Sequence, residues 1–136
     1  MMISTKGRYA MRVVIDLAQH TDDGFISLKN IAERQRISLK YLEIIISNLN
    51  KAGFVESKRG NDGGYRLVRQ AKEYTVSEIL NSVEKSLSPV KCVDKNEATC
   101  QNQSECLTHP LWQKLDTVIE KYLTSVTLED IISKNL

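Results

Sequence analysis

Residues 38–68, SLKYLEIIISNLNKAGFVESKRGNDGGYRLV, decide the fold that we expect for this chain. Their first part predicts a helix over 39–52, because its apolar residues recur at helical spacing and Ser38 is a favourable N-cap. Their second part predicts a β-hairpin, since residues 54–59 and 65–68 are typical of strands and flank the turn sequence GNDGG. The residues expected on the inner face of the helix are Leu42, Ile45, Ile46 and Leu49.

Further helices are expected on both sides of this segment. Residues 5–20 carry apolar side chains at helical spacing, and Ser27 is placed to cap a short helix that ends at the tight break 36–38. The capping-box sequence Thr75-Val-Ser-Glu78 predicts the start of another helix, which Ser88-Pro89 is expected to end. A helix, a short helix, a tight turn, a longer helix and a hairpin, in this order, predict a winged helix-turn-helix.

We therefore predict a mostly α fold in three parts. A winged helix-turn-helix domain with a two-stranded wing is expected over 1–86, and a cysteine-rich loop over 87–109. A long dimerisation helix, begun by Pro110, and a short terminal helix capped by Thr127 are expected over 110–136.

The charge distribution separates the two halves of the chain. The net charge is +2, but residues 1–69 carry +5 and residues 70–136 carry −3. A basic first half favours a nucleic-acid-binding surface there, although a solvated surface can have the same charge. No apolar run is long enough to span a membrane and the N-terminus has no signal-peptide core, so a cytoplasmic protein with reduced thiols is expected.

The predicted second helix of the helix-turn-helix turns an outward face to solvent, with Lys40, Tyr41, Glu43, Ile44, Ser47 and Asn48. Side chains near the start of a recognition helix reach base edges, and a basic wing contacts the backbone or the minor groove. A winged helix can also serve as a protein-binding module, but the basic wing favours double-stranded DNA. The predicted DNA-binding residues are Ser38, Lys40, Tyr41, Glu43, Ser47, Lys58, Arg59, Gly60 and Arg66.

All three cysteines of the chain lie in one short segment with one of its two histidines. Cys92, Cys100, Cys106 and His109 have the spacing C-x7-C-x5-C-x2-H. Thiolates and imidazole are ligands of iron–sulfur clusters and of zinc, and the segment lacks the short C-x2–4-C sequence usual in structural zinc sites. The spacing therefore favours a cluster, while a zinc site and a cysteine thiol switch stay open as alternatives.

The predicted helix after Pro110 carries a long apolar face that a winged domain does not need for its own core. A symmetric homodimer would bury this face and place two recognition helices on the half-sites of a palindromic operator, about one DNA turn apart. The predicted dimer-interface residues are Leu111, Leu115, Val118, Ile119, Tyr122 and Val126.

The sequence gives no support for an enzyme or for a small-molecule substrate. It contains no plausible catalytic pair, no phosphate-binding loop and no Ser/His/Asp arrangement. A cluster carrier that does not bind DNA is the alternative from another functional class.

Several segments resemble the IscR-type bacterial transcription regulators, whose superfamily also contains the nitric-oxide sensor NsrR and the cysteine-metabolism repressor CymR. The similarity covers nearly the whole chain. The matching segments are Ser4-Thr5-Lys6-Gly7-Arg8-Tyr9-Ala10, Ser38-Leu39-Lys40-Tyr41-Leu42-Glu43, Arg59-Gly60 with Gly63-Gly64-Tyr65, and Leu107-Thr108-His109 with Leu111-Trp112.

The resemblance implies a homodimer with crossed C-terminal helices and a [2Fe–2S] cluster. It places the cluster ligands at Cys92, Cys100, Cys106 and His109, base-reading residues at Tyr41 and Glu43, and the wing arginine at Arg59. It further implies a regulator, mainly a repressor, whose DNA affinity or specificity depends on the cluster, and which controls genes of cluster biogenesis or of related redox and sulfur metabolism. Relative to the family pattern, the segment between Cys92 and Cys100 is longer, and position 40 is Lys in place of Ser.

Overall fold

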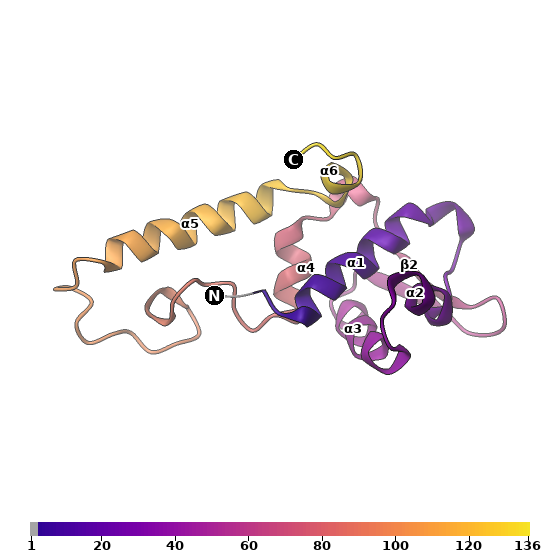
Figure 1. Cartoon of the computed structure of the whole chain (residues 1–136), viewed down its shortest axis with the longest axis horizontal. Helices are drawn as coiled ribbons and strands as arrows, with labels where there is room; N and C mark the ends of the chain where they lie inside the picture. Colours follow the sequence, from indigo (N-terminus) through magenta and orange to yellow (C-terminus); the bar gives the residue numbers. More distant parts are fainter. Residues whose placement is uncertain (1–2) are drawn as a thin grey trace.

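The computed structural model describes residues 3–136 and has two unequal regions. The shorter helices and a small hairpin pack together, and a long helix extends away from them above a long loop (Figure 1). The elements are α1 (Thr5–Gln19), η1 (Thr21–Asp23), α2 (Leu28–Gln35), α3 (Leu39–Lys51), β1 (Val55–Lys58), β2 (Gly64–Leu67), η2 (Ala71–Glu73), α4 (Val76–Val83), η3 (Lys91–Val93), α5 (His109–Ser125) and α6 (Leu128–Ile132).

Side-chain caps start the helices where the sequence predicted them. The hydroxyls of Ser27 and Ser38 accept hydrogen bonds from the backbone N–H three residues later, at 3.1 and 3.2 Å. Thr75 and Thr127 each begin a capping box, which satisfies two backbone donors at each helix start. The predicted mostly α winged-helix fold is confirmed.

The main core lies between α1, α2, α3 and the hairpin. The inner face of α3 is buried as predicted, and the hairpin adds Val55 and Leu67. Leu128 of α6 reaches the same core and is fully buried. The C-terminal segment is therefore anchored to the winged domain, since the buried side chain is removed from water at a gain of ~1.5–3 kcal/mol.

The wing is fixed to the body of the domain by a third segment. Strands β1 and β2 pair antiparallel, with Val55 opposite Leu67. Ile26 then pairs with Tyr65 through two backbone hydrogen bonds of 2.8 Å. Gly64 permits this pairing, because a Cβ there would lie 2.1 Å from the carbonyl oxygen of Ile26.

Helix α4 ends earlier than predicted, at Val83 rather than near Ser88-Pro89. Glu84 leaves the helix with extended backbone, and its carboxylate accepts hydrogen bonds from the N–H and the hydroxyl of Ser4, at 2.8 and 2.6 Å. This contact joins the start of α1 to the end of α4. A bond between residues eighty positions apart leaves no local signal in the sequence.

One residue predicted for the dimer interface, Val126, does not lie on the surface of the chain. Val126 is only 8% exposed, because it packs in its own chain against Val76 and Leu80. Its carbonyl also accepts a hydrogen bond from the N–H of Val76, at 2.9 Å. Val126 therefore has no exposed face to offer a partner. Over residues 3–136, none of the helices has the length and hydropathy needed to cross a membrane.

Candidate DNA-binding surface and cysteine loop

The outer face of α3 is mostly polar and includes one partly shielded aromatic residue. Lys40, Glu43 and Ser47 are exposed, whereas Tyr41 is half-buried. The ring of Tyr41 meets Tyr9 of α1 edge to face, with centroids 5.9 Å apart. The predicted base-reading side chains of α3 therefore lie along one side of the helix, and packing restricts the position of Tyr41.

Arg12 of α1 packs against this tyrosine pair. The guanidinium of Arg12 lies 5.0 Å from the Tyr9 ring centroid, a cation–π distance. Arg12 also donates hydrogen bonds to the side chain and the carbonyl of Gln35 at the end of α2. These contacts link α1 to both helices of the helix-turn-helix, α2 and α3, beside Tyr41, so the orientation of the recognition helix is restricted.

The wing places its basic residues in two different environments. Arg66 forms an ion pair with Glu56 on the opposite strand and lies over the ring of Phe25, 4.3 Å from its centroid. Lys58 also approaches this ring, at 5.9 Å. Arg59 is exposed at the turn, next to Gly60, whose φ is +105°. The predicted wing residues are thus together, but the charge of Arg66 is already paired.

A buried carboxylate that sequence reasoning missed fixes α2 against α1. Asp16 is 1% exposed and accepts hydrogen bonds from both Nε and Nη2 of Arg34, at 2.9 and 2.7 Å, and from Gln35 at 2.9 Å. Burial alone would raise the pKa of the Asp16 carboxyl, but these hydrogen bonds and the Arg34 charge outweigh it and leave the pKa below its ordinary value. The sequence does contain a signal for this buried carboxylate, because Asp16 occupies a position of the helical pattern where an apolar residue is expected.

The structure does not bring the four predicted cluster ligands together. Cys100 and Cys106 are exposed on the loop and Cys92 is half-exposed, whereas His109 is 6% exposed at the start of α5. Within residues 3–136, no three His, Cys, Asp or Glu side chains are arranged to hold a metal ion. Cys92 and His109 nevertheless line the same polar pocket, together with Gln103.

Two of the four predicted ligands have local hydrogen-bond partners. Nε2 of His109 lies 2.9 Å from the amide nitrogen of Gln103, which donates, so this lone pair of the imidazole is occupied. Sγ of Cys106 lies 3.3 Å from the Thr108 hydroxyl. This hydrogen bond, followed by those of the Thr108 and His109 backbone, lowers the pKa of the Cys106 thiol.

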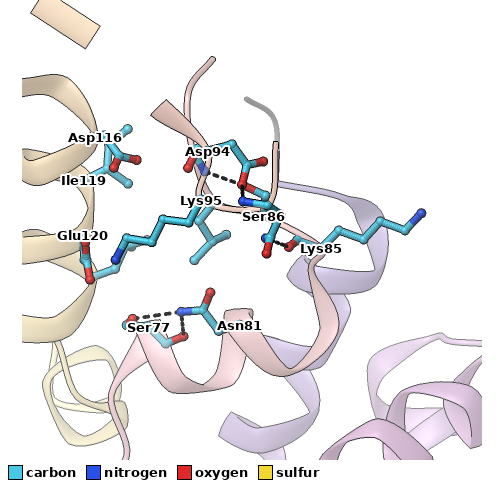
Figure 2. A pocket seen from close by; sticks show the side chains of 13 residues that line it. Ser77, Asn81, Lys85, Ser86, Asp94, Lys95, Asp116, Ile119 and Glu120 are labelled. Carbon is cyan, nitrogen blue, oxygen red and sulfur yellow. Dashed lines mark hydrogen bonds between the residues drawn. The ribbon is translucent and has the colours of Figure 1, made fainter. Parts of the chain in front are cut away.

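A neighbouring pocket joins the cysteine loop to the helices on either side. Its volume is about 160 Å³, and residues of α4, of the loop and of α5 line it. Figure 2 shows Lys95 extending from the loop toward Glu120 of α5, while Asn81 of α4 donates to Ser77. The two pockets share Asp94, Lys95 and Asp116, so the loop borders both α4 and α5 close to the predicted ligands.

Helix α5 has an apolar face that the other residues of 3–136 leave uncovered. Leu111, Leu115, Val118 and Tyr122 are all exposed. Ile119 is half-buried and lines the pocket beside α4. Four large apolar side chains at helical spacing form a stripe along the helix that extends from the body of the molecule (Figure 1).

The chain resembles a set of bacterial regulators over its full length. A family model described as "Rrf2: Iron-dependent Transcriptional regulator" matches residues 3–134. The chain is 43% identical over 135 residues to the HTH-type transcriptional regulator IscR of Photobacterium profundum, covering 99% of this chain and 77% of that protein. It is 42% identical over 132 residues to IscR of Xenorhabdus nematophila, covering 97% and 79%.

Solved structures show the same similarity. The structure of T. potens IscR has a TM-score of 0.79 and 38% identity, covering 100% of this chain and 89% of that one. The structure of CymR, the global cysteine regulator of B. subtilis, has a TM-score of 0.81 and 36% identity, covering 98% of both chains. These relatives are transcription regulators rather than enzymes. The chain belongs to the Rrf2 family and is a winged-helix, DNA-binding transcription regulator.

Proposed function

We propose that this chain is a homodimeric, sequence-specific regulator, mainly a repressor, whose DNA affinity or specificity is controlled by a [2Fe–2S] cluster. It would act on genes of iron–sulfur cluster biogenesis or of related redox and sulfur metabolism. One observation carries the proposal. All three cysteines of the chain and His109 lie in the single segment that connects α4 of the winged domain with α5.

The donor set fits a [2Fe–2S] cluster in its chemistry. Three thiolates and one imidazole, from Cys92, Cys100, Cys106 and His109, provide four ligands. The thiol of Cys106 has a lowered pKa, which favours the thiolate that a metal needs. When bound, the cluster would supply a one-electron redox change and a group sensitive to iron supply.

The residues around the loop explain how its state can reach the DNA-binding helices. The loop borders α4 and α5 at the pocket that Ser77 and Asn81 line, and α5 at the pocket that contains Cys92 and His109. Just beyond α4, Glu84 holds Ser4, and Ser4 caps α1 through a 3.0 Å bond to the N–H of Gly7. Helix α1 in turn supports Tyr41 of α3 through Tyr9. We expect a change in the loop to reach the recognition helix along these elements.

The surface that would contact DNA combines α3 with the wing. Lys40, Glu43 and Ser47 would face base edges, with Tyr41 beside them. Lys58, Arg59 and Gly60 would approach the DNA backbone or the minor groove from the wing. Ser38 caps α3 with its hydroxyl, so its contribution is to orient the helix start.

Purification without oxygen, followed by visible spectroscopy and analysis of iron, sulfide and zinc, tests the cofactor. We expect a coloured protein with about two irons and two sulfides per chain. DNA binding is then compared between the cluster-loaded and the cluster-free protein on the same duplexes. Equal affinity and equal specificity in both states would contradict cluster control but not DNA binding. One zinc per chain in a colourless protein would make the site structural.

A cysteine thiol switch is the second candidate function. Cys100 and Cys106 are exposed, and the lowered pKa of the Cys106 thiol favours the reactive thiolate. Peroxide would oxidise the two thiols to a disulfide and be reduced to water. The two candidates are separated by the metal analysis. A metal-free protein that regains no cluster on reconstitution, and whose DNA affinity changes on oxidation, would favour the thiol switch.

A further inference from the structure

The outer face of α3 contains a large apolar side chain with no partner in the domain. Ile44 is 48% exposed, whereas its neighbours Ile45 and Ile46 are buried. Of the two hydrophobic clusters formed by residues 3–136, neither includes Ile44. The exposed side chain of Ile44 therefore contributes to neither hydrophobic cluster of residues 3–136 and is free to contact another molecule.

The position of Ile44 on the helix points to the occupant of this surface. Residues three and four positions apart share a helix face, so Ile44 lies between Lys40 and Ser47, both exposed. The basic wing residues Lys58 and Arg59 belong to the same predicted DNA-binding surface. A face with this charge favours the polyanionic DNA duplex over an apolar protein partner.

DNA offers an apolar side chain one specific contact in the major groove. The C5-methyl group of thymine projects there, and cytosine has no such group. We propose that Ile44 reads thymine by packing against this methyl group, one contact in each operator half-site. The proposal rests on the DNA-binding function proposed above and adds to it a base preference that Lys40, Glu43 and Ser47 do not provide.

The residues near Ile44 are less suited to contact a thymine methyl group. Tyr41 is half-buried against Tyr9, which limits its movement toward a base. Glu43 is a hydrogen-bond acceptor, which suits the amino group of cytosine and not a methyl group. Leu39 is also exposed, but it lies five positions before Ile44, a spacing that places it on a different side of α3 from Lys40, Ile44 and Ser47.

Exchange of thymine for uracil in the duplex tests the proposal, because it removes only the methyl group. A preferred duplex is first selected from a random-sequence library with the full-length protein, in the cluster-loaded and the cluster-free form. Each thymine is then replaced by uracil, together with its symmetry mate, and Kd is measured by fluorescence anisotropy. For wild type we expect that the exchange of thymine for uracil at one position weakens binding about fourfold per half-site. Burying one methyl group contributes ~0.8 kcal/mol, and a tenfold change in Kd corresponds to ~1.4 kcal/mol.

Variants at position 44 assign that effect to the isoleucine. Ile44→Ala is expected to bind the thymine and uracil duplexes equally, while Ile44→Val keeps part of the difference. Asn50→Ala is the matched control on the same helix, since Asn50 is exposed and has no assigned role. Circular dichroism checks that each variant keeps the wild-type fold, which an exposed side chain is not needed to maintain.

The outcomes separate this proposal from the one on which it rests. If no uracil position weakens wild-type binding, or if Ile44→Ala shows the same uracil sensitivity as wild type, the thymine contact is overturned and sequence-specific DNA binding stands. If Ile44→Ala leaves the selected duplex bound with unchanged affinity, the exposed side chain serves another partner. If the library yields no preferred duplex in either form, the proposed sequence-specific function fails, and the thymine contact with it.

Discussion

Asp16 shows how one polar residue can orient two helices. It occupies a position of α1 that faces the core, among Val13, Val14 and Leu17, and all four side chains are buried. A buried carboxylate is tolerated only when its oxygens are hydrogen-bonded, and Arg34 and Gln35 satisfy them from α2. The bidentate geometry restricts both the distance and the rotation of α2 relative to α1.

Asp16→Asn is expected to lower the free energy of unfolding by about 2 kcal/mol at pH 7, because it removes a charged hydrogen-bond acceptor from Arg34. In the folded protein the pKa of Asp16 lies below the pKa of the unfolded chain, which is near the ordinary value of 3.8. The carboxylate therefore stabilises the fold above that pH, and this stability is lost as the pH falls through the folded-state pKa. Urea unfolding between pH 7 and pH 3 should show the difference between wild type and variant shrinking as the pH falls.

Asp22→Asn is the control for this experiment, since Asp22 is exposed in η1. Its effect is expected to stay within about 0.5 kcal/mol at neutral pH. A difference between wild type and Asp16→Asn that stays constant down to pH 3 would contradict the role assigned to the ionised carboxylate.

Gln103 donates a hydrogen bond to Nε2 of His109, so we expect it to limit the reactivity of this imidazole. Gln103→Ala removes the donor that occupies Nε2. We expect His109 of the metal-free protein to react about fivefold faster with diethyl pyrocarbonate, the factor that corresponds to one hydrogen bond of ~1 kcal/mol. Peptide mapping by mass spectrometry measures the reaction, with His20 as internal standard. Gln101→Ala, an exposed amide of the same loop, is the matched control, and an equal rate in both variants would overturn the assignment.

At the scale of elements, the wing divides its arginines between structure and binding. Arg66 links β2 to β1 through Glu56 and covers Phe25, which precedes the segment that pairs with Tyr65. Arg59 extends from the turn into solvent. An arginine whose charge is paired within the protein has less to gain from a phosphate than one that is exposed.

Arg59→Ala is therefore expected to weaken binding to all duplexes and to reduce the slope of log K against log salt by about one unit. Arg66→Ala is expected to change the slope less and to destabilise the wing. Titrations at several salt concentrations give both slopes, and thermal unfolding measures the stability. A larger loss of slope for Arg66→Ala than for Arg59→Ala would show that the Glu56 pair opens when DNA is bound.

Local patterns made most of the elements predictable from the sequence. The caps at Ser27, Ser38, Thr75 and Thr127 depend on residues three positions away, so the sequence alone indicates them. The inner face of α3 follows in the same way from its helical spacing. The end of α4 was not predictable, because Glu84 is held by Ser4 at the other end of the chain.

At the scale of the whole molecule, the cysteine loop is the part that sequence patterns determine least. Spacing brought Cys92, Cys100, Cys106 and His109 into one candidate set, but a loop without helical or strand periodicity has no rule that fixes which side chains meet. The bond between Gln103 and His109 is such a case, since neither residue's position in the sequence predicted it. For Val126 the helical stripe was read one turn too far, because α5 ends at Ser125 and the chain then turns into the core.

The uncovered stripe on α5 leads to a prediction about assembly. Leu111, Leu115, Val118 and Tyr122 are exposed along a helix that extends from the body of the molecule (Figure 1). An apolar stripe of this length is typical of a surface that a second copy covers, and a two-fold axis through it would pair two recognition helices. The chain is therefore expected to be a dimer at micromolar concentration.

Leu115→Glu combined with Val118→Glu should raise the dimer Kd by at least two orders of magnitude, because each unpaired carboxylate buried in the interface costs several kcal/mol and about 1.4 kcal/mol corresponds to tenfold. Sedimentation equilibrium measures this change. Circular dichroism should remain that of wild type, since neither side chain belongs to a hydrophobic cluster of residues 3–136. Lys114→Glu, an exposed charge change on the same helix, is the control and should remain dimeric. A double variant that still sediments as a dimer would place the interface elsewhere. Assembly through α5 would be supported if the double variant is monomeric and binds a duplex with two half-sites more weakly than wild type, while its binding to a single half-site is unchanged.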